Sequence, residues 1–164
     1  NYTEARYEGF GPGNSTIIVD CLTDNTNRAI TDVKTCFNKC HGAKLANSGA
    51  VSYNYESVGL FVFAYEDEDA MLEAMMEAEV DVQDISVEEG EMTVKTTFQD
   101  FGKAQDAIEK VIPGVEFDVC EATLLPTEFV TLDTQEDKEA FDKLLSMLND
   151  CDDVNKIYTN VKGE

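Results

Sequence analysis

The pattern of hydrophobic and polar positions changes its period several times along the first third of the chain. A β-branched apolar run at Thr16–Leu22 predicts a buried strand. The next segment predicts a helix over residues 27–41, stopped by Gly42. Its apolar residues recur at helical spacing, at Ile30, Val33, Phe37 and Cys40. Residues 43–49 are expected to form a loop, and alternation over residues 50–56 predicts a second strand.

The middle of the chain predicts the order β-α-β-β-α-β. Strands are expected at residues 59–65, 81–87, 92–97 and 115–125. One helix should follow the acidic run Glu66–Asp69, where the helix dipole favours carboxylates, and another should run from Phe101 to Pro113. A hairpin turn is expected at Glu89-Gly90. This order is that of a ferredoxin-like domain.

The last segment predicts a strand at residues 129–132, a helix capped by Thr134, and a strand at residues 156–161. The segments on either side of the middle part, residues 1–58 and 127–164, are then each expected to have the order β-α-β. The expected fold class is α+β, with two small α/β sandwich domains. A ferredoxin-like domain at residues 59–126 is inserted into a discontinuous domain made of residues 1–58 and 127–164.

The charge distribution agrees with this division. The net charge is −22. Residues 1–58 carry 5 basic and 6 acidic side chains, residues 59–126 carry 3 and 18, and residues 127–164 carry 4 and 10. A uniformly acidic chain would be repelled by phosphate backbones, but here the acidity is concentrated in the expected inserted domain.

The five cysteines, at positions 21, 36, 40, 120 and 151, are odd in number and follow no disulfide framework. They are interpreted as buried, reduced thiols of a cytoplasmic protein. Cys36, Cys40 and His41 lie close in sequence, but a structural zinc site needs four ligands, and no second pair has suitable spacing. No metal site and no cofactor are expected.

No motif predicts catalysis. The acidic runs are interpreted as solvated faces, because no segment matches a calcium loop and a solvent-facing run does not separate two carboxyl pKa values. The glycine-rich segment Gly9, Gly11, Pro12 and Gly13 precedes a strand, whereas a phosphate-binding loop follows one, so it is read as a turn. The chain is therefore expected not to be an enzyme and to bind no small-molecule substrate.

A modest basic face lies on the first predicted helix. Arg28 and Lys39 fall within about 20° of each other on a helical wheel, opposite the apolar positions; Lys34 lies at the flank and Lys44 in the following loop. Two interpretations stay open. These side chains are ordinary solubilising charges, or they contact nucleic-acid phosphates.

The chain has no run of 18 apolar residues, so no membrane contact is expected, and its first 13 residues do not resemble a signal peptide. It does not begin with Met, and its first residues read as a polar linker. We therefore expect a longer protein in which further sequence precedes residue 1.

Four segments resemble the YebC family, also called PmpR-type regulators, which includes mitochondrial translational activators. They are Tyr7–Gly13, Ile18–Arg28, Ser48–Tyr53 and Asp152–Asn160, in family order and spacing. The resemblance implies two α/β domains, one inserted in the other, preceded by a basic helical N-terminal domain that is missing here.

The resemblance also implies a function. The family is mostly described as DNA-binding transcriptional regulators without enzymatic activity, and several members act in translation on ribosomes. The expected function is therefore a DNA-binding regulator of transcription, and the alternative is a ribosome-associated translation factor. The partner would be DNA, or rRNA and the ribosome, contacted mainly through the missing domain.

Overall fold

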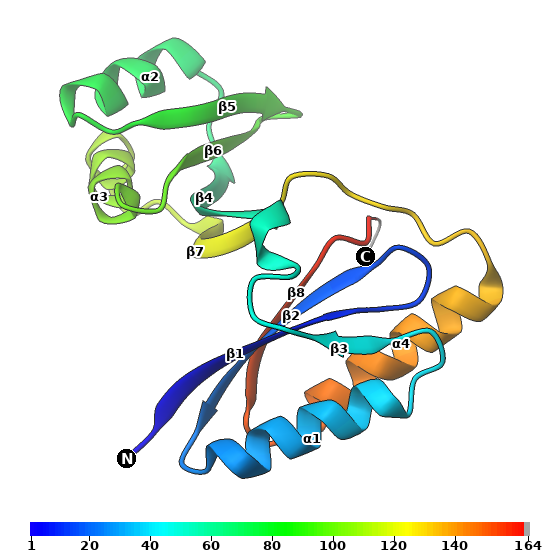
Figure 1. Ribbon diagram of the computed structural model, residues 1–164. Coiled ribbons are helices and arrows are strands. Elements are labelled where there is room, and N and C mark those ends of the chain that lie inside the picture. The colour runs from blue at the N-terminus through cyan, green and yellow to red at the C-terminus, as the bar shows by residue number, and fades with distance from the viewer. Residues whose placement is uncertain (163–164) are drawn as a thin grey trace. The chain divides into compact units, whose positions relative to one another are not determined.

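The computed structural model describes residues 1–162 and separates them into two compact units (Figure 1). The first unit consists of Asn1–Glu56 together with the chain from Pro126 onward, and the second unit is Ser57–Leu125. Within the described residues, no helix has both the length and the apolar character needed to cross a membrane.

The first unit contains a four-stranded antiparallel sheet in the order β3-β1-β2-β8. Its strands are β1 (Thr3–Phe10), β2 (Thr16–Thr23), β3 (Lys44–Ala46) and β8 (Val154–Thr159). β1 and β2 form a hairpin. The β-branched run of β2 occupies a central position, and Ile17, Ile18 and Val19 are completely buried.

Helices α1 (Thr26–Asn38) and α4 (Gln135–Asn149) pack on one face of this sheet (Figure 1). Side-chain oxygens cap both helices: Asn25 accepts from the backbone N–H of Arg28, and Thr134 accepts from that of Asp137. The buried core of the unit consists of Ile17, Val19, Cys21, Ala29, Val33, Cys36, Phe37, Cys40, Leu132, Phe141, Leu144, Leu148 and Val161.

The second unit has a sheet in the order β5-β6-β4-β7, covered on one face by two helices. Its strands are β4 (Tyr55–Ala64), β5 (Val82–Glu88), β6 (Glu91–Thr97) and β7 (Phe117–Pro126), and its helices are α2 (Glu68–Glu77) and α3 (Phe101–Val111). Phe61 stacks on Phe101 with ring centroids 5.1 Å apart. The first and third strands of this unit therefore lie at its centre, which is the ferredoxin-like arrangement.

The predicted fold class is confirmed: the protein is α+β, with two small domains, two four-stranded sheets and four helices over the described residues. The expected hairpin turn is also present. Glu89 and Gly90 both have positive φ, 52° and 79°, as a two-residue hairpin loop requires. The acidic run begins α2 as predicted, with Asp67 accepting from the N–H of Ala70.

The predicted strand at residues 50–56 is wrong. Residues 48–51 turn, a short 3₁₀ helix follows at Ser52–Asn54, and β4 begins only at Tyr55. The physical reason is the carboxylate of Glu8, which accepts the backbone N–H groups of this turn and so takes donors that a sheet would need.

The predicted strand at residues 129–132 is also wrong, because Val130 forms only an isolated bridge to Val161. Strands β1 and β3 were not predicted. In β1 the core-facing positions are Ala5, Tyr7 and Gly9, which together carry little apolar signal. The first unit therefore reads β1-β2-α1-β3 and then α4-β8, rather than β-α-β plus β-α-β.

Candidate nucleic-acid interface

Helix α1 positions most of the basic residues that the sequence singled out. Its buried side carries Ala29, Val33, Cys36 and Phe37, which fix the rotation of the helix against the sheet. Arg28 and Lys34 then fall on exposed positions of the helix, and Lys39 is its C-cap residue, where a positive charge complements the helix dipole. The helix thus presents cations to solvent.

Arg28 is already held by two carboxylates. Its Nε and Nη2 donate to the two oxygens of Asp153 at 3.0 and 2.9 Å, and Nη2 also donates to Asp24 at 2.8 Å. The hydrogen bonds with Asp153 contribute most to raising the pKa of Arg28, and the bond with Asp24 adds to them. The guanidinium in turn lowers the pKa of Asp153. Because Asp153 is only 7% exposed, this pair ties α1 to the turn before β8, and a phosphate would have to compete with it.

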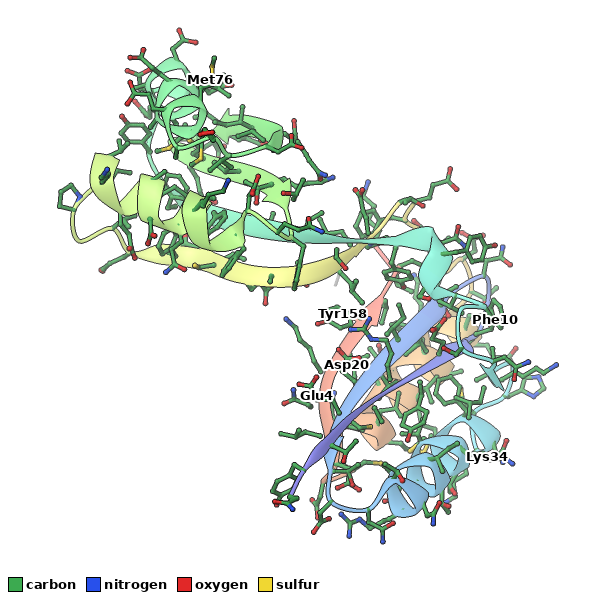
Figure 2. All side chains as sticks on the ribbon, turned by 60° about the vertical axis from the view of Figure 1, so that its left-hand side comes forward. Glu4, Phe10, Asp20, Lys34, Met76 and Tyr158 are labelled. Carbon is green, nitrogen blue, oxygen red and sulfur yellow. The ribbon has the colours of Figure 1, made fainter. Side chains whose placement is uncertain are left out.

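Lys34, Lys39 and Lys44 are free to bind. All three are exposed, and within residues 1–162 none lies within 4.0 Å of a carboxylate oxygen. Figure 2 shows Lys34 on the outer side of α1. Lys44 opens β3, the edge strand of the first sheet. We call these three residues the lysine set.

A further lysine approaches the end of α1 from a distant part of the sequence. Cys40 donates to the carbonyl of Ala140 in α4 at 3.3 Å, and burial raises the pKa of Cys40 against the opposing charge of Lys143. Lys143 follows Ala140 on α4 by three residues, and its positive charge acts on Cys40, the residue after Lys39. Helical spacing alone could not reveal this neighbour, because the contact joins segments 100 residues apart.

A hollow of about 330 Å³ on the same unit carries two more lysines. Lys138 and Lys162 line it together with Asp142, over a floor that includes Leu132 and Phe141. The carboxylate offsets one of the two positive charges. The hollow therefore extends the basic character of the first unit only weakly.

The glycine-rich segment begins at the end of β1 with Gly9 and continues into the turn of the β1–β2 hairpin, and its glycines have structural roles. A Cβ on Gly9 would lie 2.4 Å from the ring of Phe37, and one on Gly11 would lie 2.3 Å from Ser15 Oγ. Gly13 has φ of +62°. The carbonyl of Pro12 accepts from Ser15 Oγ at 2.8 Å. The predicted turn is confirmed, and most of its glycines are explained by close packing.

Glu8 is a buried carboxylate that no sequence motif indicates. It is 3% exposed and accepts from the N–H groups of Gly49, Val51 and Ser52 at 2.9, 2.9 and 2.8 Å. Burial pushes the pKa of Glu8 upward, but these backbone donors outweigh burial and lower it. Glu8 thereby fixes the loop that follows Lys44. Its position inside the Tyr7–Gly13 segment was the available signal.

The other face of the first sheet combines cations and an aromatic ring with a carboxylate that binds the nearest cation. Arg6 donates to both oxygens of Asp20, at 2.6 and 2.9 Å, and Lys156 lies 5.2 Å from the ring centroid of Tyr158. Asp20 and Tyr158 are labelled in Figure 2. Asp20 also faces Lys156 across the strands, so this carboxylate offsets part of the positive charge of the face.

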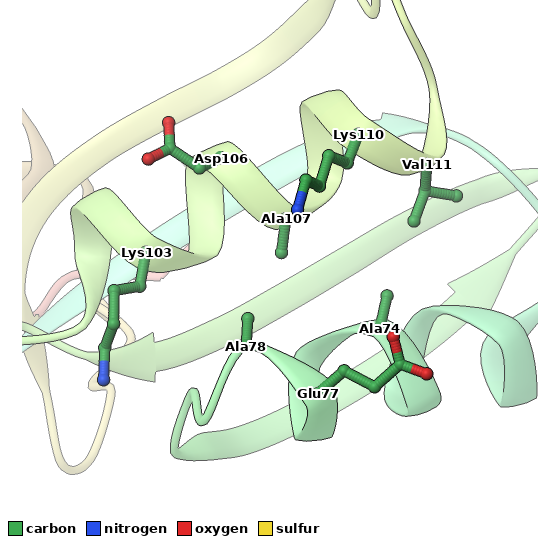
Figure 3. A pocket seen from close by; sticks show the side chains of 8 residues that line it. All are labelled: Ala74, Glu77, Ala78, Lys103, Asp106, Ala107, Lys110 and Val111. Carbon is green, nitrogen blue, oxygen red and sulfur yellow. The ribbon is translucent and has the colours of Figure 1, made fainter.

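The second unit offers no comparable basic surface. A hollow of about 430 Å³ between α2 and α3 has a floor of alanines (Figure 3). Lys103 and Lys110 stand at its rim with Glu77 and Asp106, so its charges cancel. The whole unit carries 18 acidic and 3 basic side chains. A phosphate backbone would be repelled by this unit.

Comparison with known proteins gives consistent matches over nearly the whole chain. A family model described as "TACO1/YebC second and third domain" matches residues 2–161. A protein of Saccharophagus degradans is 49% identical over 162 residues, and one of Pseudoalteromonas atlantica is 47% identical over 164 residues. Both are named "Probable transcriptional regulatory protein", and the chain covers 67% of the length of each.

A solved structure has the same fold. The crystal structure of a conserved hypothetical protein from Aquifex aeolicus matches with a TM-score of 0.76 and 29% sequence identity. The match covers 98% of this chain and 65% of that one. The chain thus spans about two thirds of the length of the proteins it resembles.

Proposed function

This chain belongs to the TACO1/YebC family, and we propose that it is part of a DNA-binding regulator of transcription that acts in the cytoplasm. Its curated relatives are named as transcriptional regulators, which supports a role in gene expression and a nucleic-acid partner. The proposal assigns no catalytic step to the chain.

One observation carries the assignment of a contact to this part of the protein: the lysine set is exposed and unpaired within residues 1–162. Free lysines bind phosphates as point charges and release counterions when they do so. Arg28 adds to them only by sharing the carboxylates of Asp24 and Asp153. The first unit therefore makes a supporting phosphate contact in our proposal.

The main affinity is assigned elsewhere. A net charge of −22 opposes association with a polyanion, and three lysines supply a small part of what tight binding requires. We therefore propose that a basic helical domain preceding residue 1 supplies most of the affinity, as the family resemblance implies. The lysine set would then fix the position of this part on the nucleic acid.

The acidity of the second unit favours an alternative partner, the ribosome. A unit with 18 acidic and 3 basic side chains is suited to basic protein segments, and ribosomes present such segments beside their RNA. In this alternative the lysine set contacts rRNA, and the second unit faces protein. The protein would then act as a translation factor.

A charge-matched pair of variants tests the contact. In the longest natural form of the protein, Lys34→Gln with Lys39→Gln should weaken binding to duplex DNA about 3- to 10-fold and lower the salt slope by about one to two. Lys103→Gln with Lys110→Gln removes the same charge from the second unit and should leave both nearly unchanged. Fluorescence anisotropy across a salt series measures affinity and slope.

The variants test the contact, and the unmodified protein separates the two partners. Equal weakening by both pairs would show a nonspecific effect of net charge and would remove the lysine set from the interface. If the unmodified protein has no affinity for duplex DNA at low salt but co-sediments with ribosomes, the translation alternative replaces the transcription proposal. Absence from ribosomal fractions would remove the alternative.

A further inference from the structure

Four of the five cysteines gather in the core of the first unit. Cys21, Cys36 and Cys40 are buried there, and Cys151 packs against them from the turn that follows α4. Cys120 is partly buried and packs against the core of the second unit. All five are free thiols in this structure.

One pair of sulfur atoms is in direct contact. The Sγ atoms of Cys36 and Cys151 lie 3.7 Å apart, although the residues are separated by 115 positions. Cys40 instead donates to the carbonyl oxygens of Ala140 and His41. The distances therefore single out Cys36 and Cys151 from the cluster.

The surroundings of the pair allow it to close into a disulfide. A disulfide needs sulfurs about 2.05 Å apart, so these must approach by less than 2 Å. Cys36 is held rigidly in α1, but Cys151 lies half-buried in a turn between exposed Asp150 and Asp152. Rotation of the Cys151 side chain with a small shift of this turn supplies the movement without disturbing the helix.

We propose that Cys36 and Cys151 are a latent disulfide site, which oxidation by a small-molecule disulfide such as glutathione disulfide converts into a covalent link between α1 and the α4–β8 turn. The thiolate of Cys151, the more exposed of the two, attacks one sulfur of glutathione disulfide and releases one glutathione. The thiolate of Cys36 then attacks the Cys151 sulfur of this mixed disulfide and releases the second glutathione. Two protein thiols are oxidised, and one disulfide is reduced to two thiols.

The link would reinforce a connection that already exists. Arg28 of α1 binds Asp153 of the same turn, so the disulfide would join the same two elements two helical turns further along α1. Reaction should be slow at neutral pH. Burial first, and then the hydrogen bond with Cys36, raise the pKa of Cys151 to about 12, and only a thiolate attacks a disulfide.

The test is oxidation of the folded protein with glutathione disulfide at pH 8.5, followed by peptide mapping under non-reducing conditions. We expect one intramolecular link between Cys36 and Cys151, with a mass loss of two hydrogens, and a rise of about 5–15 °C in the melting temperature of the first unit. A reducing agent should reverse both. The long-range pairing itself reports the native fold, because an unfolded chain would favour near pairs such as Cys36 and Cys40.

Variants provide the controls. Cys120→Ser should leave the link intact, whereas Cys36→Ser or Cys151→Ser should abolish it. Peptide mapping of the unmodified protein decides the matter even if a core serine impairs folding. The proposal is overturned by a stable glutathione adduct on Cys151 without a link, by a link that pairs either residue with Cys21 or Cys40, or by no loss of thiols after prolonged oxidation.

Discussion

The two units share a plan, a four-stranded sheet under two helices, but they use charge in opposite ways. The first unit carries 9 basic and 16 acidic side chains, and several of its carboxylates bind particular donors. Glu8 binds a loop, Asp20 binds Arg6, and Asp153 binds Arg28. The second unit carries 3 basic and 18 acidic side chains, so most of its carboxylates have no cation to pair with.

This difference shows where each unit obtains its order. In the second unit the apolar core and the helix ends position the chain. Asp67 and Asp100 each accept a backbone N–H there, but with 18 acidic and 3 basic side chains most of the carboxylates have no cation to pair with. In the first unit, buried polar contacts fix loops that the hydrophobic pattern leaves undefined. Apolar substitutions should therefore damage the two units equally, whereas polar substitutions should damage the first unit more.

Matched core truncations test whether the two units are energetically separate. Phe141 and Phe61 are both almost fully buried, one in each core. Phe141→Ala and Phe61→Ala should each lower the free energy of unfolding of their own unit by about 3–5 kcal/mol, because each leaves a large cavity. Hydrogen exchange resolved by peptide would measure each unit by itself. Accelerated exchange in both units from either variant would show a single cooperative structure and break the comparison.

Glu8→Gln tests whether a buried polar contact stabilises the first unit. The amide keeps the shape of the side chain but places an NH₂ group against one of three backbone donors. We expect a loss of about 2–3 kcal/mol from the first unit and no change in the second. Glu4→Gln, an exposed position on the same strand, serves as the control and should be nearly neutral. Peptide-resolved hydrogen exchange again separates the units.

The contribution of Glu8 should also depend on pH in a defined direction. Its pKa in the folded protein is lowered from an ordinary value of 4.5. Its stabilisation is therefore fully present above about pH 4.5 and is lost as the pH falls through the folded-state pKa. The difference between the unmodified protein and Glu8→Gln should shrink in acid. A difference that stays constant from pH 7 to pH 3 would show that the charge of Glu8 is not what holds the loop.

The sequence predicted the second unit better than the first, and the reason is physical. In residues 59–125 the apolar positions repeat with the period of each element, and turn residues such as Gly90 mark the boundaries. Local rules and tertiary structure agree there. In the first unit, β1 places Ala5 and Gly9 toward the core, and the turn at Val51 depends on a carboxylate 43 residues away. A short stretch of sequence read by itself shows neither the core-facing positions of β1 nor the contact between Glu8 and this turn.

The candidate interface shows the same limit. Helical spacing predicts that Arg28, Lys34 and Lys39 lie away from the buried side of α1, and they are exposed. Spacing could not reveal that Arg28 binds Asp153, that Cys40 contacts Ala140 of α4, or that Cys36 contacts Cys151. Each of these depends on a contact between residues 100 or more positions apart. Their part in binding nucleic acid stays a prediction.

A matched pair of glycine substitutions gives the smallest and finest test. Gly9 lies in the first unit against the ring of Phe37 and the carbonyl of Lys44, which a Cβ would approach to 2.4 and 2.9 Å. Gly9→Ala should cost about 1–3 kcal/mol, because the strand must shift away from α1 to accept the methyl group. Gly102 lies within α3 of the second unit, and a Cβ there would have no atom within 4 Å.

Gly102→Ala should therefore stabilise the second unit by about 0.5–1 kcal/mol, since alanine costs less backbone entropy in a helix than glycine. The same chemical change thus has opposite signs in the two units, because one glycine is required by packing and the other is not. Urea unfolding followed by peptide-resolved hydrogen exchange measures both signs. A stabilising Gly9→Ala would mean that β1 can move away from Phe37 at little cost, and that the hairpin turn before β2 does not depend on the close approach at Gly9.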